Sequence, residues 1–340
     1  KFVNNVPKAN LDFENLTKSI KDINAKSSMT VDGQGKNLTF PNANVTSNPR
    51  FTWTLPAGMQ VALKNIHFNN WTSGTGNKWG YITLNGNYLR LENITGLGKD
   101  GDGNPGYRLA GTLYLKNEGK GSTVEIVGGT STNVQQLYYS IGSGFDSIIL
   151  RSSESGTTYF SPIRIDATKN LKLVSLQGQE VRLYYTRATN VEMEGPIIFD
   201  NRDQVNLSGN GFSSNGVLDN LVLTGDTTIY KSSMYRGDRG AINGINSFVS
   251  NGHKISGAGN GYALQNNEFF AMGKNAGVLD ATDFYVANPD EKTTEVAKRL
   301  YFTSADNGTK IKTKNLDTEP IEVEHPDGTK KQYATYEAAL

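Results

Sequence analysis

Short segments in which apolar and polar residues alternate recur along most of this chain, and each ends at Gly, Asn or Asp. Three of these segments contain Leu38, Leu63 and Leu91, which are 25 and 28 residues apart. Self-similarity at a period of about 20–50 residues is typical of stacked repeats, and a period of two within each segment is typical of β-strands. We therefore expect these three leucines to form one internal column of an all-β solenoid.

A second series of strand segments interleaves with the first. It comprises residues 81–85, 112–117, 136–141, 162–166, 180–185 and 196–201. Helical patterns between the strands are absent, which argues against βαβ units. The alternatives are a β-propeller, whose blade signatures are absent, and a β-sandwich, for which Asn85-Gly86 is a hairpin signal. A coil corner uses the same residue types, so the solenoid is the preferred prediction.

The composition agrees with a chain that turns often and lacks thiol chemistry. Glycine accounts for 37 of the 340 residues and Asn is frequent, and both tolerate positive φ at turns. The absence of Cys excludes disulfides, thiol catalysis and Cys-ligated metals. His67, His253 and His325 lack metal-ligand spacing, and we expect no cofactor or metal.

The charge balance restricts the partners. A net charge of +1 creates no general attraction to nucleic acid or to a membrane, so a charged partner must be recognised by a local basic patch. No apolar run of about 18 residues is present, and we expect no membrane insertion.

Both ends of the predicted solenoid carry a helical pattern. Residues 10–24 form a short amphipathic pattern, and residues 290–300 form a second one. A solenoid end exposes its core and an unpaired strand, so the first helix is expected to cap it. We predict an N-terminal cap over 1–30, a solenoid over 31–290, a C-terminal cap or appendage over 291–340, and a monomer.

The segment Val31–Phe40, with the sequence VDGQGKNLTF, follows the first predicted helix and resembles the first coil of pectate-lyase-like parallel β-helices. The Asn- and Gly-rich coils and Tyr-rich strands over roughly residues 10–290, without Cys, are similar to the binding regions of serine-rich repeat adhesins from lactobacilli. This resemblance implies a right-handed β-solenoid (β-helix), secreted and attached to the wall of a Gram-positive bacterium. It also implies binding of host glycans or of plant polysaccharides such as pectin-type uronates. No motif transfers a binding residue by position.

Four side chains are predicted to form a binding ladder for an acidic polysaccharide. Sugar rings stack on aromatic faces, and Arg or Lys pairs with uronate carboxylates. Arg164 and Arg182 each lie between two apolar residues, so the period of two directs both outward if those neighbours point inward. Tyr114 and Tyr139 are taken as the equivalent residues of earlier coils. The alternative is that stacked Tyr and Arg side chains only cover a face of the solenoid.

Further aromatic and basic residues are predicted to contribute to the same surface from corners and loops. They are Trp71, Lys78, Trp79, Tyr184, Tyr185, Arg187, Arg202, Lys231 and Arg236. Arg236-Gly-Asp238 is also the integrin attachment tripeptide, but three residues recur easily by chance, so cations for a polymer groove are the preferred interpretation.

Catalysis is the second hypothesis. The Asn-Thr-Asp, Asp-Asp, Gly-His-Gly and Arg-Ile-Lys signatures of β-helix uronan hydrolases are absent, and residues 164–166 and 251–253 differ from them at the decisive positions. Asp200, Arg202 and Asp203 are the one tight acid–base cluster. The sequence therefore favours a non-catalytic adhesin module that binds acidic polysaccharide, with a β-helix polysaccharide lyase or hydrolase as one alternative and a structural or protein-binding surface module as another.

Overall fold

The computed structural model is all-β in the part of the chain that it describes. The described residues are 6–7, 28–39, 51–69, 79–96, 112–128, 138–152, 163–176, 181–200, 216–232, 242–253, 255–258, 270–272, 279–280, 302–303, 311–312, 321–324 and 326–333. These residues contain strands β1 to β22 and no helix. The chain divides into two compact units, Lys1–Lys169 and Asn170–Leu340.

Unit 1 contains two stacks of parallel strands. In the first stack, each strand pairs in parallel with the next along the list. Its members are β1 (Val6–Pro7), β2 (Ser28–Thr39), β4 (Gln60–Asn69), β6 (Tyr88–Gly96), β8 (Thr123–Val127) and β10 (Phe145–Arg151). The second stack is parallel in the same way. Its members are β3 (Phe51–Thr54), β5 (Trp79–Leu84), β7 (Thr112–Asn117), β9 (Tyr138–Ile141) and the start of β11 (Ile163–Val174).

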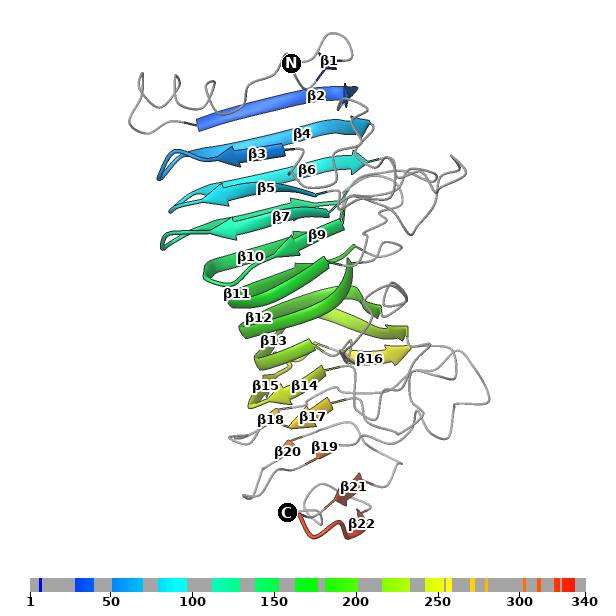
Figure 1. Cartoon of the computed structure of the whole chain (residues 1–340). Coiled ribbons are helices and arrows are strands. Elements are labelled where there is room, and N and C mark those ends of the chain that lie inside the picture. The colour runs from blue at the N-terminus through cyan, green and yellow to red at the C-terminus, as the bar shows by residue number, and fades with distance from the viewer. Residues whose placement is uncertain are drawn as a thin grey trace. The chain divides into compact units, whose positions relative to one another are not determined.

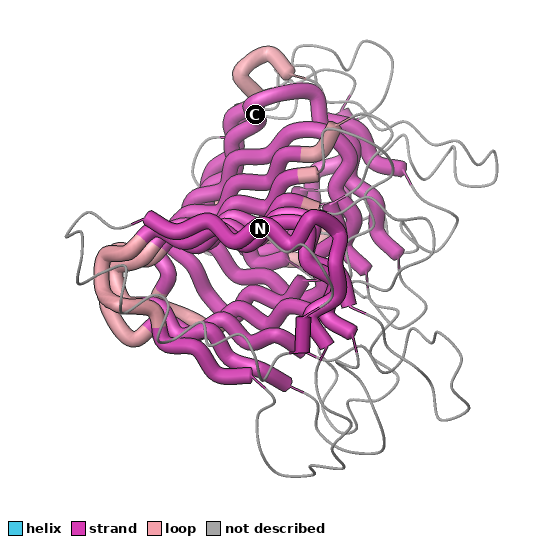
Figure 2. Tube along the Cα trace, turned by 90° about the horizontal axis from the view of Figure 1, so that it is seen from above, coloured by secondary structure: helices cyan, strands magenta, loops and turns pink. Residues whose placement is uncertain are grey.

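From β2 to β11, successive strands alternate between the two stacks, which is how a coiled chain is built. In Figure 1 the arrows of β4 and β6 point one way and those of β3, β5 and β7 point the other. Figure 2 shows strands of successive coils running side by side along curved paths. Parallel pairing of strands from successive coils is the arrangement that the sequence predicts.

A left-handed asparagine turns the chain within the first stack. Asn65 and Asn93 both have φ of 52°, a conformation that Asn tolerates better than most residues. Leu63 and Ile66 are both buried, so the alternation of buried and exposed residues shifts phase at Asn65. The amide Nδ2 of Asn93 donates to Asn65 Oδ1 at 2.8 Å, and Asn65 Nδ2 donates to Asp32 Oδ1 at 3.2 Å. These bonds connect three coils at the corner.

The core of unit 1 consists of in-register columns of apolar side chains. One column contains Val31, Leu63, Leu91, Ile126 and Leu150, all at most 7% exposed. The predicted column of Leu63 and Leu91 is therefore correct.

The prediction was wrong for Leu38, which is in register with Phe68. The reason is that β2 runs continuously past the irregularity between Asp32 and Lys36, so Val31 takes the place that Leu38 was expected to take.

Unit 2 begins with long strands. β12 (Val181–Asp200) pairs in parallel with β13 (Gly216–Ser232) along most of its length. Parallel pairing then continues through short strands, and the last pair is antiparallel. These strands are β14 (Ile242–Ile245), β15 (Ser247–Val249), β16 (Ile255–Ala258), β17 (Phe270–Met272), β18 (Leu279–Asp280), β19 (Phe302–Thr303), β20 (Ile311–Lys312), β21 (Ile321–Glu324) and β22 (Lys330–Tyr333).

A ladder of amides joins successive coils of unit 2. Asn220 Nδ2 donates to Asn190 Oδ1 at 3.1 Å, and Asn190 Nδ2 donates to Asn170 Oδ1 at 3.0 Å. Ser247 Oγ extends the ladder by donating to Asn220 Oδ1 at 3.0 Å. Stacked Asn side chains recur where identical positions of successive strands lie above one another.

The two predicted helices, residues 10–24 and 290–300, lie outside the described residues. The predicted segment 162–166 falls largely within β11, which continues to Val174, and the predicted segments 180–185 and 196–201 both fall largely within β12. Strands therefore continue through bends at which separate segments were expected. Gly195 allows one such bend, with φ of 79° and an approach to Ser175 so close that a Cβ would lie 1.7 Å from the Ser175 carbonyl oxygen.

Candidate functional site

The outward surface of β5, β7, β9 and β11 in unit 1 carries the strongest candidate site. Ile82, Leu115 and Ile165 are fully buried, so their neighbours at odd spacing point away from the core. Tyr81 is in register with Tyr114, Tyr114 with Ser140, and Ser140 with Arg164. We call the set Tyr81, Tyr114, Lys116, Arg164 and Asp166 the aromatic–cationic face.

The two tyrosines of this face form a pair with a cation above it. The ring centroids of Tyr81 and Tyr114 are 5.2 Å apart, and the rings are tilted by 32°. Lys116 Nζ lies 3.5 Å from the Tyr81 centroid. A ring face attracts an ammonium through its quadrupole and leaves the positive charge uncompensated. Lys116 therefore presents its charge next to an aromatic surface.

Arg164 stands further along the same column. Its Nε donates to Asp166 Oδ1 at 2.7 Å, and both side chains are partly exposed. Burial and the neighbouring Tyr81 raise the pKa of Tyr114, while the charge of Arg164 opposes that rise. The phenol of Tyr114 is therefore neutral at physiological pH and acts as a hydrogen-bonding group.

The structure corrects one member of the predicted ladder. Tyr139 is 4% exposed and is in register with the buried Leu113, so its ring belongs to the core. Burial raises the pKa of its phenol. The outward residue at this coil is Ser140, and the outward tyrosine that sequence reasoning missed is Tyr81. Tyr139 was misassigned because the predicted register of β9 was one residue off, and a shift of one residue moves a side chain to the opposite side of a strand.

Arg164 and Arg182 fall in different units, because unit 2 begins at Asn170. The side chain of Arg182 is not described, so the proximity of the two arginines remains a prediction. The same holds for the other predicted residues whose strands are described without their side chains. These are Trp79 in β5, Tyr184 and Tyr185 in β12, and Lys231 in β13.

The remaining predicted residues divide into one that is described and four that are not. Arg187 is exposed in β12 and is in register with Val217 of β13. Trp71, Lys78, Arg202 and Arg236 lie outside the described residues.

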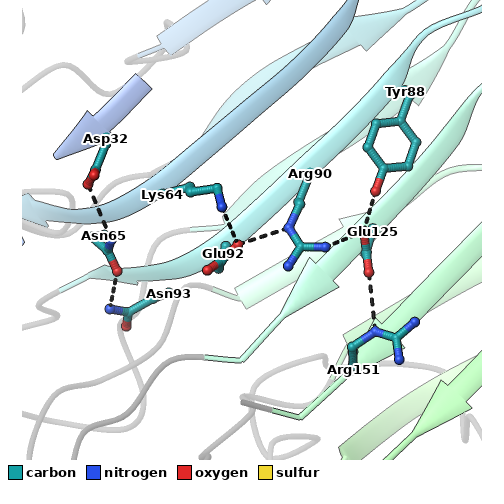
Figure 3. Close-up of polar contacts among 9 residues, drawn as sticks. All are labelled: Asp32, Lys64, Asn65, Tyr88, Arg90, Glu92, Asn93, Glu125 and Arg151. Atoms are coloured by element: carbon teal, nitrogen blue, oxygen red, sulfur yellow. Dashed lines mark hydrogen bonds and ion pairs between the residues drawn. The ribbon is translucent and has the colours of Figure 1, made fainter. Parts of the chain in front are cut away.

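A second polar cluster lies on the outward surface of the first stack, and Figure 3 shows its contacts. Glu125 is 5% exposed although its position in β8 alternates with core residues. Its Oε2 accepts from the Tyr88 hydroxyl and from Arg90 Nη1 at 2.7 Å. Its Oε1 accepts from Arg151 Nε at 3.2 Å. Three long side chains thus surround one carboxylate.

Glu92 lies in β6 with Arg90 and connects this cluster to Lys64 of β4. Its Oε2 accepts from Arg90 Nε at 2.9 Å and from Lys64 Nζ at 3.0 Å. We call Lys64, Tyr88, Arg90, Glu92, Glu125 and Arg151 the Glu125 network. Together these residues connect β4, β6, β8 and β10.

The electrostatics of the Glu125 network keep its carboxylates ionised. Burial alone raises the pKa of Glu125, but the hydrogen bonds from Tyr88, Arg90 and Arg151 outweigh burial and leave the pKa below its ordinary value of 4.5. Burial also raises the pKa of Glu92, and Lys64 and Arg90 likewise bring it below 4.5. A carboxylate of lowered pKa is a poor general acid near neutral pH.

Sequence reasoning did not select the Glu125 network. The sequence did contain a signal for it, because Arg90 and Glu125 are oppositely charged and each lies between two apolar residues of its strand. Recognising it required the register of β6 on β8, and the two partners are 35 residues apart.

Comparisons with known proteins leave the chain without an assigned relative. No protein-family model matches the sequence, and no match was found among curated proteins or solved structures.

Within the described ranges, no helix is long and apolar enough to cross a membrane. The same ranges contain no group of three or more His, Asp or Glu side chains that could hold a metal ion.

Proposed function

We propose that the chain is a non-catalytic binding module for an acidic polysaccharide, with the aromatic–cationic face as its contact surface. The observation that carries the proposal is the column from Tyr81 through Tyr114 and Ser140 to Arg164, with Lys116 over the first ring. Tyrosine and hydroxyl groups contact sugar rings, and Lys and Arg pair with carboxylates. A polymer that runs across the strands contacts one outward residue of this column for each coil.

The electrostatics favour binding over acid–base catalysis. The two carboxylates of the Glu125 network, Glu92 and Glu125, are both paired with cations and have lowered pKa values. On the aromatic–cationic face, Asp166 is paired with Arg164. A lyase or hydrolase needs a carboxyl group or a base whose pKa suits proton transfer.

The wider proposal follows the resemblance to serine-rich repeat adhesins. In this proposal the fold is a right-handed β-solenoid with an N-terminal capping helix, secreted and displayed on a Gram-positive cell wall. Its partners are pectin-type uronates or acidic host glycans. Arg182, Tyr184 and Tyr185 of unit 2 are proposed as further contacts for the same class of ligand.

The test is a titration of the whole chain with oligogalacturonate at low ionic strength, by calorimetry or by biolayer interferometry. We expect binding by the wild type and a loss of at least tenfold in K116Q/R164Q. A matched control is K172Q, because Lys172 is a partly exposed lysine of unit 2 that pairs with Glu192 at 2.7 Å. Equal affinity of K116Q/R164Q and wild type excludes this face, and release of unsaturated or reducing sugar ends shows an enzyme instead.

A further inference from the structure

The two cations of the aromatic–cationic face are held by different kinds of partner. Lys116 lies 3.5 Å over the ring of Tyr81, whereas Arg164 donates its Nε to a carboxylate oxygen of Asp166 at 2.7 Å. A ring leaves the charge of its cation in place, and a carboxylate cancels it. The face therefore presents one exposed charge and one internally neutralised charge.

Period two places Arg164 and Asp166 on the same side of β11. Ile163 and Ile165 are fully buried, and the side chains of Arg164 and Asp166 are 32% and 42% exposed. The carboxylate of Asp166 thus lies at the outward surface beside the guanidinium. A uronate carboxylate that approaches Arg164 meets a like charge of the same chemical type.

We propose that Asp166 is an internal competitor for Arg164, a carboxylate that occupies the guanidinium and lowers the affinity of the face for densely charged uronans. This inference rests on the proposed function. A ligand carboxylate either displaces Asp166 from Nε or binds beside it against its negative charge. Lys116 contacts a ring rather than a carboxylate, and the ring leaves its charge uncompensated, so Lys116 makes the first electrostatic contact.

Asp166 repels ligands through its negative charge, so it distinguishes polymers of similar shape by the number of carboxylates they carry. A fully ionised polygalacturonate carries one carboxylate for each sugar and must meet Asp166 wherever it passes Arg164. A methyl-esterified polymer has no carboxylate to be repelled. Asp166 therefore shifts the preference of the face towards polymers with sparse carboxylates.

The experiment compares D166N with wild type on oligogalacturonate and on the same oligomers after methyl esterification. Removing a competing charge between partly exposed groups is expected to tighten binding of the acid form about two- to fivefold. Binding of the esterified form is expected to stay unchanged. The partly exposed position of Asp166 makes the variant compatible with folding, which a thermal melt verifies.

Two further variants show whether the effect acts through Arg164. R164Q/D166N should bind no more tightly than R164Q alone, because the competitor then has nothing to occupy. E192Q removes a carboxylate from an ion pair of the same 2.7 Å length in unit 2 and should leave the affinity unchanged.

The outcomes separate the two proposals. If wild type binds and D166N binds equally or more weakly, the competitor is refuted while the proposed function stands, and a weaker D166N shows that Asp166 positions Arg164. A gain that persists without Arg164, or that E192Q reproduces, also refutes the competitor. If neither wild type nor D166N binds oligogalacturonate, the proposed function fails and the competitor fails with it.

Discussion

Glu125→Gln should destabilise unit 1 more than breaking an exposed ion pair, such as Lys172–Glu192, destabilises the chain. The replacement keeps the shape of the side chain but removes its charge and turns one oxygen into a donor. That donor must then face Arg90 or else Arg151. A guanidinium group only donates, so neither arginine can accept a hydrogen bond from it, whereas the Tyr88 hydroxyl can accept one if its own proton rotates away. One buried acceptor site is lost whichever way the amide is oriented.

The magnitude follows from burial. Breaking a fully buried ion pair costs about 3–5 kcal/mol. Glu125 is 5% exposed, but the side chains of Arg90 and Arg151 are 30% and 37% exposed and keep part of their hydration. We therefore expect a loss of about 2–3 kcal/mol, which is a fall in melting temperature of roughly 5–10 °C for a unit of this size.

The assay is thermal unfolding combined with amide hydrogen exchange, which localises the loss to β6, β8 and β10. The control is Glu192→Gln, which breaks the exposed Lys172–Glu192 pair and should cost under about 1 kcal/mol. Equal effects of the two variants, or faster exchange confined to unit 2, would refute the reasoning.

The same network predicts how stability depends on pH. The pKa of Glu125 is lower in the folded chain than its ordinary value of 4.5, so its contribution is fully present above pH 4.5 and is lost as the pH falls through the lowered value. The stability difference between wild type and Glu125→Gln should therefore be constant near neutral pH and shrink in acid. A difference that grows on acidification would contradict this sign.

Three further experiments test the fold and the proposed face. Asn190→Ala removes two rungs of the amide ladder in unit 2 and should cost about 1–2 kcal/mol, measured as a fall in melting temperature. Gly195→Ala should cost well above the ~1–2 kcal/mol of a left-handed alanine, because its Cβ meets the Ser175 carbonyl. Gly252→Ala has nearly the same φ with no atom within 4 Å and should show only that backbone cost, and equal losses at the two glycines would contradict the steric argument. Binding of oligogalacturonate should weaken as salt rises, more steeply in wild type than in K116Q, and equal slopes would count against Lys116.

The strands themselves could be predicted from the sequence because alternation of apolar and polar residues is a local signal. Arg164 was expected to point outward if its apolar neighbours Ile163 and Ile165 point inward, and both neighbours are buried. The parallel pairing of Leu63 with Leu91 was also expected and is present.

The register between coils could not be predicted as well, because the coils differ in length. Val61 pairs with Leu89, Leu89 with Val124, and Val124 with Ile148, which are steps of 28, 35 and 24 residues. With two adjacent tyrosines before Ser140, a slip of one residue exchanges core and surface. This exchange explains why Tyr139 was assigned to the ladder.

The Glu125 network could not be predicted from the sequence for a different physical reason. Alternation correctly places Glu125 on the outer side of β8, where a carboxylate is normally solvated. Its burial comes from Tyr88, Arg90 and Arg151, which reach it from neighbouring coils. Only the three-dimensional stacking shows that an outward position is enclosed.

The unequal coil steps have a consequence for how such a chain can change over evolution. Inserting or deleting residues between β6 and β8 need not shift the pairing of Leu89 with Val124, since the partners already tolerate a step of 35 residues beside one of 24. Single outward positions, or the length of one connection, can then change without redesigning the interior. The outer surface of a protein built in this way can change one coil at a time.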